Sequence, residues 1–287
     1  MADWGTDTIR KFTSDGVGSV FASSGLNDPY GLAFDNAANL YVGNQGNREI
    51  LKFTPGGIGS VFAADSGAFS PDALAFDSTG NLYVSNGGFP DEIRKYTPGG
   101  VGSVFADNAD GLSSPLGLAF DSAGNLYVAN SNTIVKFTPG GVGSVFADAS
   151  DGLQHPAGLA FDGAGYLYAA SETSPIILKF SPDGVGSTFA SSSTAGPLGT
   201  TLAFDSAGNL YKSGLAMIEK FTPDGVRSTF ADAGDGLFRV SYLAFTDDNG
   251  VPLKLPPSGA VPEPTTLALL GFGLPALLGL SRRRPSA

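Results

Sequence analysis

Amide and carboxylate side chains recur once in each repeat of this sequence, directly after a short apolar run. The column reads Asp3, Asn44, Asn86, Asn130, Ser171 and Gly214. Oxygen atoms of Asn and Asp bind Ca²⁺ and sugar hydroxyl groups, so these side chains could form a ligand site where the repeats meet. Asn and Asp also hydrogen-bond backbone groups at strand ends, and the degeneration of the column to Ser171 and Gly214 favours that structural role. The ligand-binding prediction is therefore Asp3, Asn44, Asn86 and Asn130, with Ca²⁺ as the one ion left open and no other cofactor.

A second column of side chains follows a proline in four of the repeats. Its members differ in every repeat, and they are Tyr30, Asp72, Leu116 and Ala157. Such variety permits a surface that recognises one specific ligand, and it equally permits neutral drift of loop residues. The sequence leaves these two interpretations open.

Catalytic residues are hard to find in this chain. It has no cysteine and one histidine, His155, which excludes thiol catalysis and His-rich metal sites within one chain. His155 could act as a general base, but an exposed loop residue is the better interpretation. Glu49, Glu92 and Glu172 fall in loops of unknown orientation, so no acidic partner can be identified. We predict no catalytic residue and no metal ligand.

The composition points to a folded, acidic domain. The chain has 287 residues, 41 Gly, 21 Phe and a formal net charge of -11. The aromatic residues can build a sizeable core, and the negative charge disfavours binding of nucleic acid phosphates.

The elements that position these columns are set by an internal repeat. The tetrad Leu-Ala-Phe-Asp begins at Leu32 and recurs after 42, 44, 41 and 43 residues, and a sixth copy at Leu243 ends in Thr246. A period in the low forties with several short apolar runs is typical of a four-stranded blade of a β-propeller. We therefore predict an all-β, six-bladed propeller over residues 1–255.

One unit illustrates the predicted strands. They cover residues 118–120, 125–128, 133–138 and 144–147. Gly124 suits the left-handed position of the first hairpin. Pro139-Gly140-Gly141 predicts a type II turn, whereas Pro-Asp-Gly in later units favours type I.

The sixth blade requires both ends of the chain. Residues 9–13 and 19–22 supply its two outer strands, residues 242–245 its first strand, and residues 251–255 a candidate second strand. Met1 aligns with Val42 at the end of a second strand, and from this we expect the natural protein to begin upstream with a signal peptide. Joining the ends removes open sheet edges that invite aggregation.

The repeats resemble NHL-type propellers. The similarity lies in Pro-x-Gly-Leu-Ala-Phe-Asp, Gly-Asn-Leu-Tyr-Val and Ile-x-Lys-Phe, and it covers roughly residues 2–255. The resemblance implies the fold but not the function, because this fold hosts lyases, lactonases and pure binding modules.

The C-terminus closely resembles a PEP-CTERM sorting signal. A Pro-rich linker (residues 256–264) contains Val261-Pro262-Glu263-Pro264, an apolar segment (265–281) predicts a short membrane helix, and the tail (282–287) contains Arg282-Arg283-Arg284. The three Arg favour a cytoplasmic tail and an external propeller. The resemblance implies recognition and cleavage by an exosortase-type enzyme in a Gram-negative bacterium, with transient anchoring in the inner membrane.

Two functional classes follow from these features. The favoured one is an exported, non-enzymatic propeller in the cell envelope or outside the cell, which binds an extracellular polysaccharide or protein and contributes to biofilm. Near-identical blades favour it, because an active site needs asymmetry. The alternative is a metal-dependent propeller hydrolase of the lactonase type, or a lyase.

Overall fold

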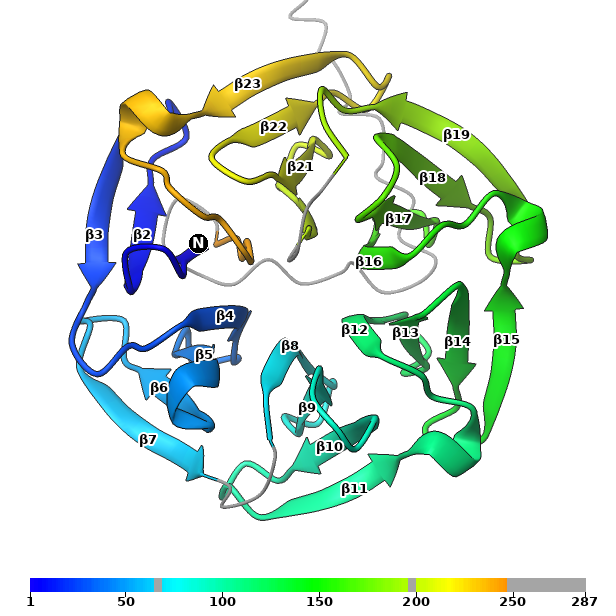
Figure 1. The fold of residues 1–287 in the computed structure, drawn as a ribbon, viewed down its shortest axis with the longest axis horizontal. Helices are drawn as coiled ribbons and strands as arrows, with labels where there is room; N and C mark the ends of the chain where they lie inside the picture. Colours follow the sequence, from blue (N-terminus) through cyan, green and yellow to red (C-terminus); the bar gives the residue numbers. More distant parts are fainter. Residues whose placement is uncertain (65–68, 196–199, 247–287) are drawn as a thin grey trace, which may run out of the picture.

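The computed structural model describes residues 1–64, 69–195 and 200–246, and these form six antiparallel sheets arranged around a central axis (Figure 1). Five sheets contain four strands in sequence order from the axis outward. The predicted six-bladed propeller is therefore confirmed. Among the described residues, no helix is long and apolar enough to cross a membrane. The predicted C-terminal helix (265–281), the sorting motif and the basic tail lie outside the described residues.

The first three complete blades begin after the two N-terminal hairpins. Blade 1 consists of β4 (Pro29–Phe34), β5 (Leu40–Asn44), β6 (Glu49–Phe53) and β7 (Gly59–Ala64). Blade 2 consists of β8 (Pro71–Phe76), β9 (Leu82–Asn86), β10 (Glu92–Tyr96) and β11 (Gly102–Ala106). Blade 3 consists of β12 (Pro115–Phe120), β13 (Leu126–Asn130), β14 (Thr133–Phe137) and β15 (Gly143–Ala147).

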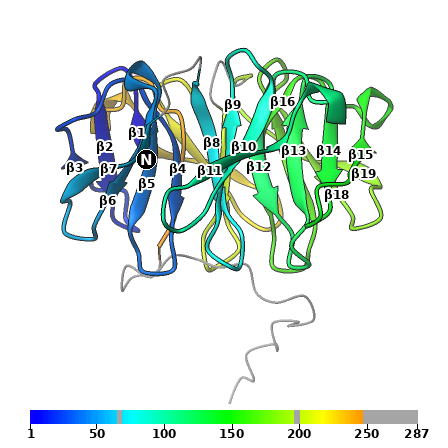
Figure 2. The ribbon, with the colours of Figure 1, turned by 90° about the horizontal axis from the view of Figure 1, so that it is seen from below.

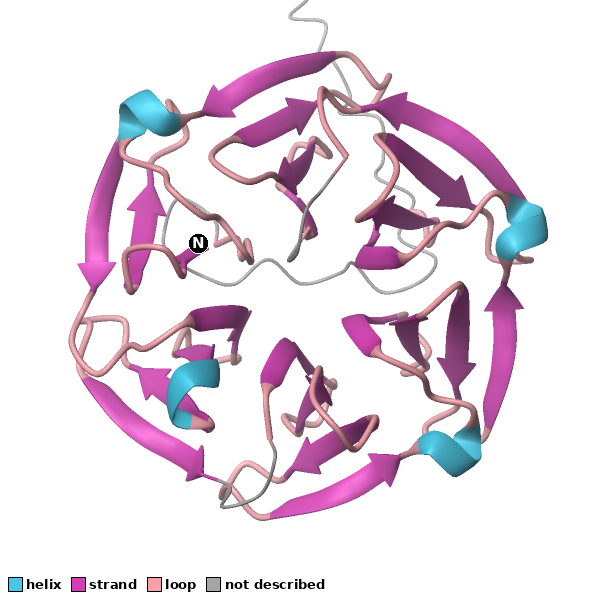
Figure 3. Cartoon of the chain, in the orientation of Figure 1, coloured by secondary structure: helices cyan, strands magenta, loops and turns pink. Residues whose placement is uncertain are grey.

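Two more complete blades and four short 3₁₀ helices follow the same plan. Blade 4 consists of β16 (Pro156–Phe161), β17 (Leu167–Ser171), β18 (Ile176–Phe180) and β19 (Gly186–Ser191). Blade 5 consists of β20 (Leu202–Phe204), β21 (Leu210–Ser213), β22 (Ile218–Phe221) and β23 (Arg227–Ala231). The 3₁₀ helices are η1 (Gln45–Asn47), η2 (Asn108–Asp110), η3 (Ala149–Asp151) and η4 (Ala233–Asp235), and Figure 3 shows them between strands.

Blade 6 joins the two ends of the chain, as predicted. The N-terminus supplies β1 (Ala2–Asp3), β2 (Thr8–Phe12) and β3 (Gly18–Ala22). Ala2 N–H donates to Tyr242 O (3.0 Å), and Asp3 forms an isolated β-bridge with Val240, so the C-terminal segment lies beside β1 in the place of the first strand. The continuous strand predicted over residues 242–245 does not form. The second place belongs to β1, and the predicted strand 251–255 lies outside the described residues.

Alternating connections define two faces of the propeller. The first-to-second and third-to-fourth strand hairpins lie on one side, which we call the lower face. The second-to-third loops and the links between blades lie on the other, the upper face (Figure 2). The upper face therefore presents the ends of every second strand and the starts of every first strand.

The lower hairpins correct one turn prediction. In Pro139-Gly140-Gly141 the positive φ lies at Gly141 (85°), whereas a type II turn requires it at Gly140. Thr138 O accepts from Gly141 N (2.9 Å), and Gly184 of a Pro-Asp-Gly unit has the same arrangement (2.9 Å, φ 88°). Both sequence types therefore make one turn, because the residue after the Pro-x pair supplies the left-handed conformation.

The core between blades is a repeated aromatic contact. Tyr41 of β5 meets Phe62 of its own outer strand and Phe76 of the next blade, both edge-on at 4.9 Å. The contact recurs around Tyr83, Tyr127 and Tyr168. Edge-to-face pairs contribute about 0.5–1.5 kcal/mol each beyond the area they bury. Each of these aromatic contacts holds one blade against its neighbour, and together they make the ring that carries the upper face rigid.

Candidate functional site

The side chains of Asp3, Asn44, Asn86 and Asn130, which we call the amide column, lie on the upper face. There they form hydrogen bonds to the backbone of neighbouring loops. Asn44 Oδ1 accepts from Asn27 N (2.7 Å), and its Nδ2 donates to Gly25 O (3.0 Å) and Glu49 Oε1 (2.9 Å). Asn86 and Asn130 repeat the first contact, accepting from Ser70 N at 2.7 Å and Ser113 N at 2.6 Å. These three buried amides therefore hold the link that enters their own blade.

Asp3 occupies the same place in blade 6 and accepts three backbone hydrogen bonds. Its Oδ1 accepts from Gly5 N (3.1 Å) and Arg239 N (3.0 Å), and its Oδ2 accepts from Phe238 N (3.0 Å). Asp3 is fully buried. Its carboxylate thus holds the C-terminal segment against the N-terminal strand.

These contacts are those of the structural role that the sequence favoured. The column does not converge on the axis, because each member faces the link of its own blade. The described residues contain no group of three or more His, Cys, Asp or Glu side chains arranged to hold a metal ion. Binding of Ca²⁺ or a ligand by Asp3, Asn44, Asn86 and Asn130 stays a prediction.

The second, variable column brings titratable groups together near the axis. The first strands surround the axis in Figure 1, and β4 and β8 carry Tyr30 and Asp72 close to their upper ends. Tyr242 of the C-terminal segment stacks at a tilt against Tyr30, with 5.7 Å between ring centroids. Gln45 Nε2 donates to Asp72 Oδ1. Together with Glu172, these residues form what we call the axial cluster.

Asp72 is the most perturbed carboxyl group of this cluster. Burial raises its pKa, the hydrogen bond from Gln45 opposes the rise and the charge of Glu172 adds to it, with a net pKa of about 7. A Cβ on Gly87 would lie 1.4 Å from Asp72 Oδ2, so only glycine allows the carboxyl group this position. Asp72 is therefore protonated in part of the molecules at neutral pH and can donate or accept a proton there.

The two tyrosines respond to the same charges. Burial raises the pKa of Tyr30, and the negative charges of Asp72 and Glu172 raise it further. Burial likewise raises the pKa of Tyr242 well above its ordinary value. Both hydroxyl groups therefore stay protonated and can donate hydrogen bonds. The cluster offers two phenols, an amide and two carboxyl groups, which suit a ligand rich in hydroxyl groups.

Sequence reasoning grouped only two of the five residues of this cluster. Tyr30 and Asp72 were visible as a variable column, but Glu172, Gln45 and Tyr242 come from other loops. The sequence alone could not identify an acidic partner in the channel, whereas in the structure the charge of Glu172 contributes to the raised pKa of Asp72. In the sequence, Glu172 could be recognised as a candidate only by its position in the loop after β17.

The other acidic and basic candidates have local partners. Glu49 accepts from Asn44 and from Asn47 (3.2 Å), and Glu92 forms an ion pair with Arg94 (2.6 Å). His155 is exposed on the link before β16, and its carbonyl accepts from Glu172 N (3.1 Å). The exposed position expected for His155 is confirmed.

The Asp pairs between blades, which resemble calcium loops in sequence, cap the 3₁₀ helices. Asp107 Oδ1 accepts from Ala109 N (2.7 Å), while Asp110 Oδ2 accepts from Asp107 N (3.1 Å). Asp148 with Asp151 and Asp232 with Asp235 form the same capping box. Turn chemistry therefore explains these pairs.

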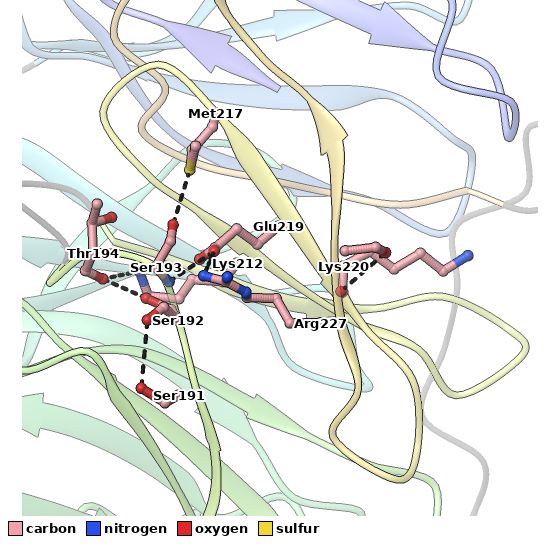
Figure 4. Close-up of polar contacts among 10 residues, drawn as sticks. Ser191, Ser192, Ser193, Thr194, Lys212, Met217, Glu219, Lys220 and Arg227 are labelled. Atoms are coloured by element: carbon pink, nitrogen blue, oxygen red, sulfur yellow. Dashed lines mark hydrogen bonds and ion pairs between the residues drawn. The ribbon is translucent and has the colours of Figure 1, made fainter.

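A second polar site, the blade 5 charge cluster, was not foreseen from the sequence. Lys212, Glu219 and Arg227 replace residues that are Val128, Val135 and Gly143 in blade 3. Glu219 Oε1 accepts from Ser193 N (2.9 Å) and from Arg227 Nη1 (3.1 Å) (Figure 4).

Lys212 is the unusual member of this cluster. It is 1% exposed and pairs with Glu219 across β21 and β22. Its Nζ donates to Thr194 O at 3.4 Å (Figure 4). Burial lowers the pKa of Lys212, and the charge of Glu219 opposes that change. The charges compensate one another inside the blade, so the cluster acts first as a polar substitute for apolar packing.

Comparison with known proteins gives two findings. Residues 260–284 match the PEP-CTERM protein-sorting motif. This motif implies an exported protein of a Gram-negative bacterium that an exosortase sorts. No protein of curated function matches the chain.

Solved structures share the propeller fold. A gluconolactonase from Xanthomonas campestris has 23% identity and a TM-score of 0.62, with 74% of this chain and 77% of that chain covered. Virginiamycin B lyase from Staphylococcus aureus has 16% identity and a TM-score of 0.58, covering 71% and 69%. A streptogramin B lyase has 16% identity and a TM-score of 0.60, covering 81% and 75%. At these identities the likeness shows the fold alone.

Proposed function

We propose that this chain is an exported, exosortase-processed propeller that acts as a binding protein of the extracellular matrix. The sorting motif at residues 260–284 carries the proposal, because it implies delivery of the propeller to the cell envelope. The rigid ring supplies a platform, and its upper face differs from blade to blade. The membrane segment (265–281) would anchor the chain until processing near Pro262-Glu263-Pro264.

Non-enzymatic binding is favoured over catalysis by how the upper face uses its polar groups. The repeated amides hold backbone within each blade, and the axial cluster combines hydroxyl and carboxyl groups around two tyrosines. Hydroxyl-rich ligands such as polysaccharides match that chemistry. The same face could equally contact another matrix protein.

The sorting step is tested by following the mass of the full chain in a Gram-negative host with and without its exosortase gene. We expect loss of the C-terminal tail only when exosortase is present. Replacing Pro262, Glu263 and Pro264 by Ala should preserve the tail. The matched control, Pro256→Ala with Pro257→Ala, should be processed normally. An identical intact mass in both hosts would contradict the proposal.

A second candidate function, metal-dependent hydrolysis of the lactonase type, is supported by the fold shared with a gluconolactonase and by the buried Asp72 carboxyl group. A pKa of about 7 suits a general acid or base at neutral pH. The test is hydrolysis of glucono-1,5-lactone by the purified full chain with Ca²⁺, Mn²⁺ or Zn²⁺. We expect only the spontaneous rate. Metal-dependent turnover that Asp72→Asn abolishes would replace binding by catalysis as the function.

A further inference from the structure

Apolar side chains gather on the upper face where the two chain ends meet. Phe238 and Leu215 are 57% and 54% exposed, and Trp4 is half-buried beside them. Arg239 lies over both rings, with its Cζ 4.4 Å from the centroid of Trp4 and 5.8 Å from that of Phe238. We call these four residues the closure patch.

The patch is held rigidly from below. The buried Asp3 carboxylate accepts from the backbone N–H groups of both Phe238 and Arg239. Trp4 N–H donates to Arg239 O (3.1 Å), and Val240 N–H donates to Leu215 O (3.2 Å). Every member thus has its backbone fixed, which reduces the entropy lost when a partner binds.

Gly5 shapes the patch as well. A Cβ on Gly5 would lie 2.4 Å from Cδ1 of Phe238 and 3.2 Å from Cβ of Arg239. The Phe238 ring therefore rests directly on the backbone of residue 5. The side chain nevertheless remains 57% exposed.

We propose that the closure patch binds a neutral polysaccharide, with a sugar ring lying on Phe238 beside the Arg239–Trp4 pair. The C–H groups of a pyranose ring suit the negative face of an aromatic ring. The exposed Arg239 guanidinium supplies hydrogen-bond donors for sugar hydroxyl groups. This inference rests on the proposed matrix-binding function and names its ligand class and its surface.

Charge selects the neutral polymer over an anionic one. The chain carries a formal net charge of -11, and exposed Asp7 lies on the same loop as Trp4 and Gly5. A polymer of uronic acids would meet repulsion from this surface that one guanidinium does not offset. A neutral polysaccharide meets no such repulsion.

The chain contains its own reporter for this site, because Trp4 is its single tryptophan. The test titrates the full chain with dextran, cellohexaose and, as the anionic comparison, alginate. Trp4 fluorescence and retardation in native gels that contain the polymer are measured together. We expect a spectral change and retardation with a neutral polymer and neither with alginate.

Variants then assign the binding to the patch. Phe238→Ala should weaken binding about tenfold, equivalent to about 1.4 kcal/mol. Gly5→Ala should also weaken it, because the added methyl group displaces the Phe238 ring. Phe89→Ala is the matched control, since Phe89 is 82% exposed on the loop after β9 and belongs to another blade. Equal unfolding midpoints in urea would show that all variants are folded.

Three outcomes would overturn the inference. The first is that no neutral polymer changes Trp4 fluorescence or gel mobility. The second is that Phe89→Ala weakens binding as much as Phe238→Ala does. The third is that the patch variants abolish self-association or capture of a protein, without any effect of polysaccharide. None of these results would alter processing by exosortase, so failure here is distinguishable from failure of the proposed function.

Discussion

The lower and upper faces of the propeller are made by the same blades but follow different rules. On the lower face, Asp121 Oδ1 accepts from Ala123 N (2.9 Å) and Asn125 N (2.8 Å), and its Oδ2 accepts from Asn125 Nδ2 (2.7 Å). Blades 1, 2 and 5 repeat all three bonds with Asp35, Asp77 and Asp205. Blade 4 keeps the two bonds to Asp162 Oδ1, with Tyr166 in place of the Asn. One type of hairpin therefore serves the five complete blades.

The upper face repeats the first hydrogen bond of the amide column and, in three links between blades, the Asp capping box, but its other loops differ from blade to blade. After the amide column, the loops contain a 3₁₀ helix in blade 1, exposed Phe89 in blade 2 and exposed Leu215 in blade 5. The second-to-third loops of the upper face also return the chain between paired strands, but their lengths and sequences vary from blade to blade. The difference teaches that specific chemistry in this molecule belongs to the upper face.

The largest expected effect is on the pH dependence of stability, and it comes from Asp72 on the upper face. The unfolded chain releases the Asp72 proton near pH 4, whereas the folded chain retains it up to a pH of about 7. The contribution of Asp72 to the free energy of unfolding therefore falls as the pH rises from about 4 to 7. A difference of about three pH units corresponds to on the order of 4 kcal/mol. Asp72→Asn should raise the free energy of unfolding by up to that amount at pH 8 and leave it unchanged at pH 4.

Urea unfolding of both proteins between pH 4 and 8 measures this difference. Glu172→Gln is the informative companion, because it removes the charge that raises the pKa of Asp72. It should reduce the pH dependence without removing it. A difference between Asp72→Asn and the parent that does not vary with pH would refute the raised pKa.

The repeated elements are also the part of the molecule that sequence alone could predict. Strands 118–120, 125–128, 133–138 and 144–147 were found within one to three residues of β12 to β15. Each local rule recurs in every blade, so errors at one unit are corrected by the others. The joined sixth blade followed from counting strands at both ends.

The axial cluster and the closure patch could be predicted only in part, because neither repeats. Tyr30, Asp72 and Glu172 come from three different blades, and their proximity depends on closure of the ring. Arg239 covers Trp4 from the other end of the chain. The blade 5 charges were hidden for a different reason, since a lone Lys in a strand gives no sign of burial.

The second prediction tests whether blade 5 follows the rule of the other blades. Replacing Lys212, Glu219 and Arg227 by Val, Val and Gly gives this blade the residues of blade 3. Exchange of buried charges for well-packed apolar residues is often stabilising, here by about 2 kcal/mol. The midpoint of urea unfolding should rise.

The single variant Glu219→Val sharpens this result. It leaves Lys212 buried without its carboxylate and should destabilise the protein, in contrast to the triple variant. If the triple variant is less stable than the parent, the blade 5 charge cluster contributes net stability and is not a tolerated substitute for apolar packing.

The third prediction concerns the lower face. Asp121→Ala removes three hydrogen bonds, but the freed backbone groups of this partly exposed turn can bind water. We expect a loss of about 1.5 kcal/mol in the free energy of unfolding. Asp205→Ala should cost the same within about 0.5 kcal/mol, because its turn has the same sequence and the same three hydrogen bonds. A clearly unequal loss would show that the lower hairpins are not interchangeable.

The smallest expected effect tests whether the exposed Phe238 side chain on the upper face contributes to stability. Phe238→Ser on the upper face and Val142→Ser on the lower face both alter an exposed apolar side chain, and Val142 is 69% exposed. Each should change the free energy of unfolding by less than about 0.5 kcal/mol. Calorimetric melting of the two variants beside the parent provides the measurement. A large loss from Phe238→Ser alone would mean that its contact with Gly5 stabilises ring closure, and the exposed ring would then have a structural reason to be there. Equal and negligible losses would leave Phe238 without a structural role, as expected if the asymmetry of the upper face is kept for a ligand.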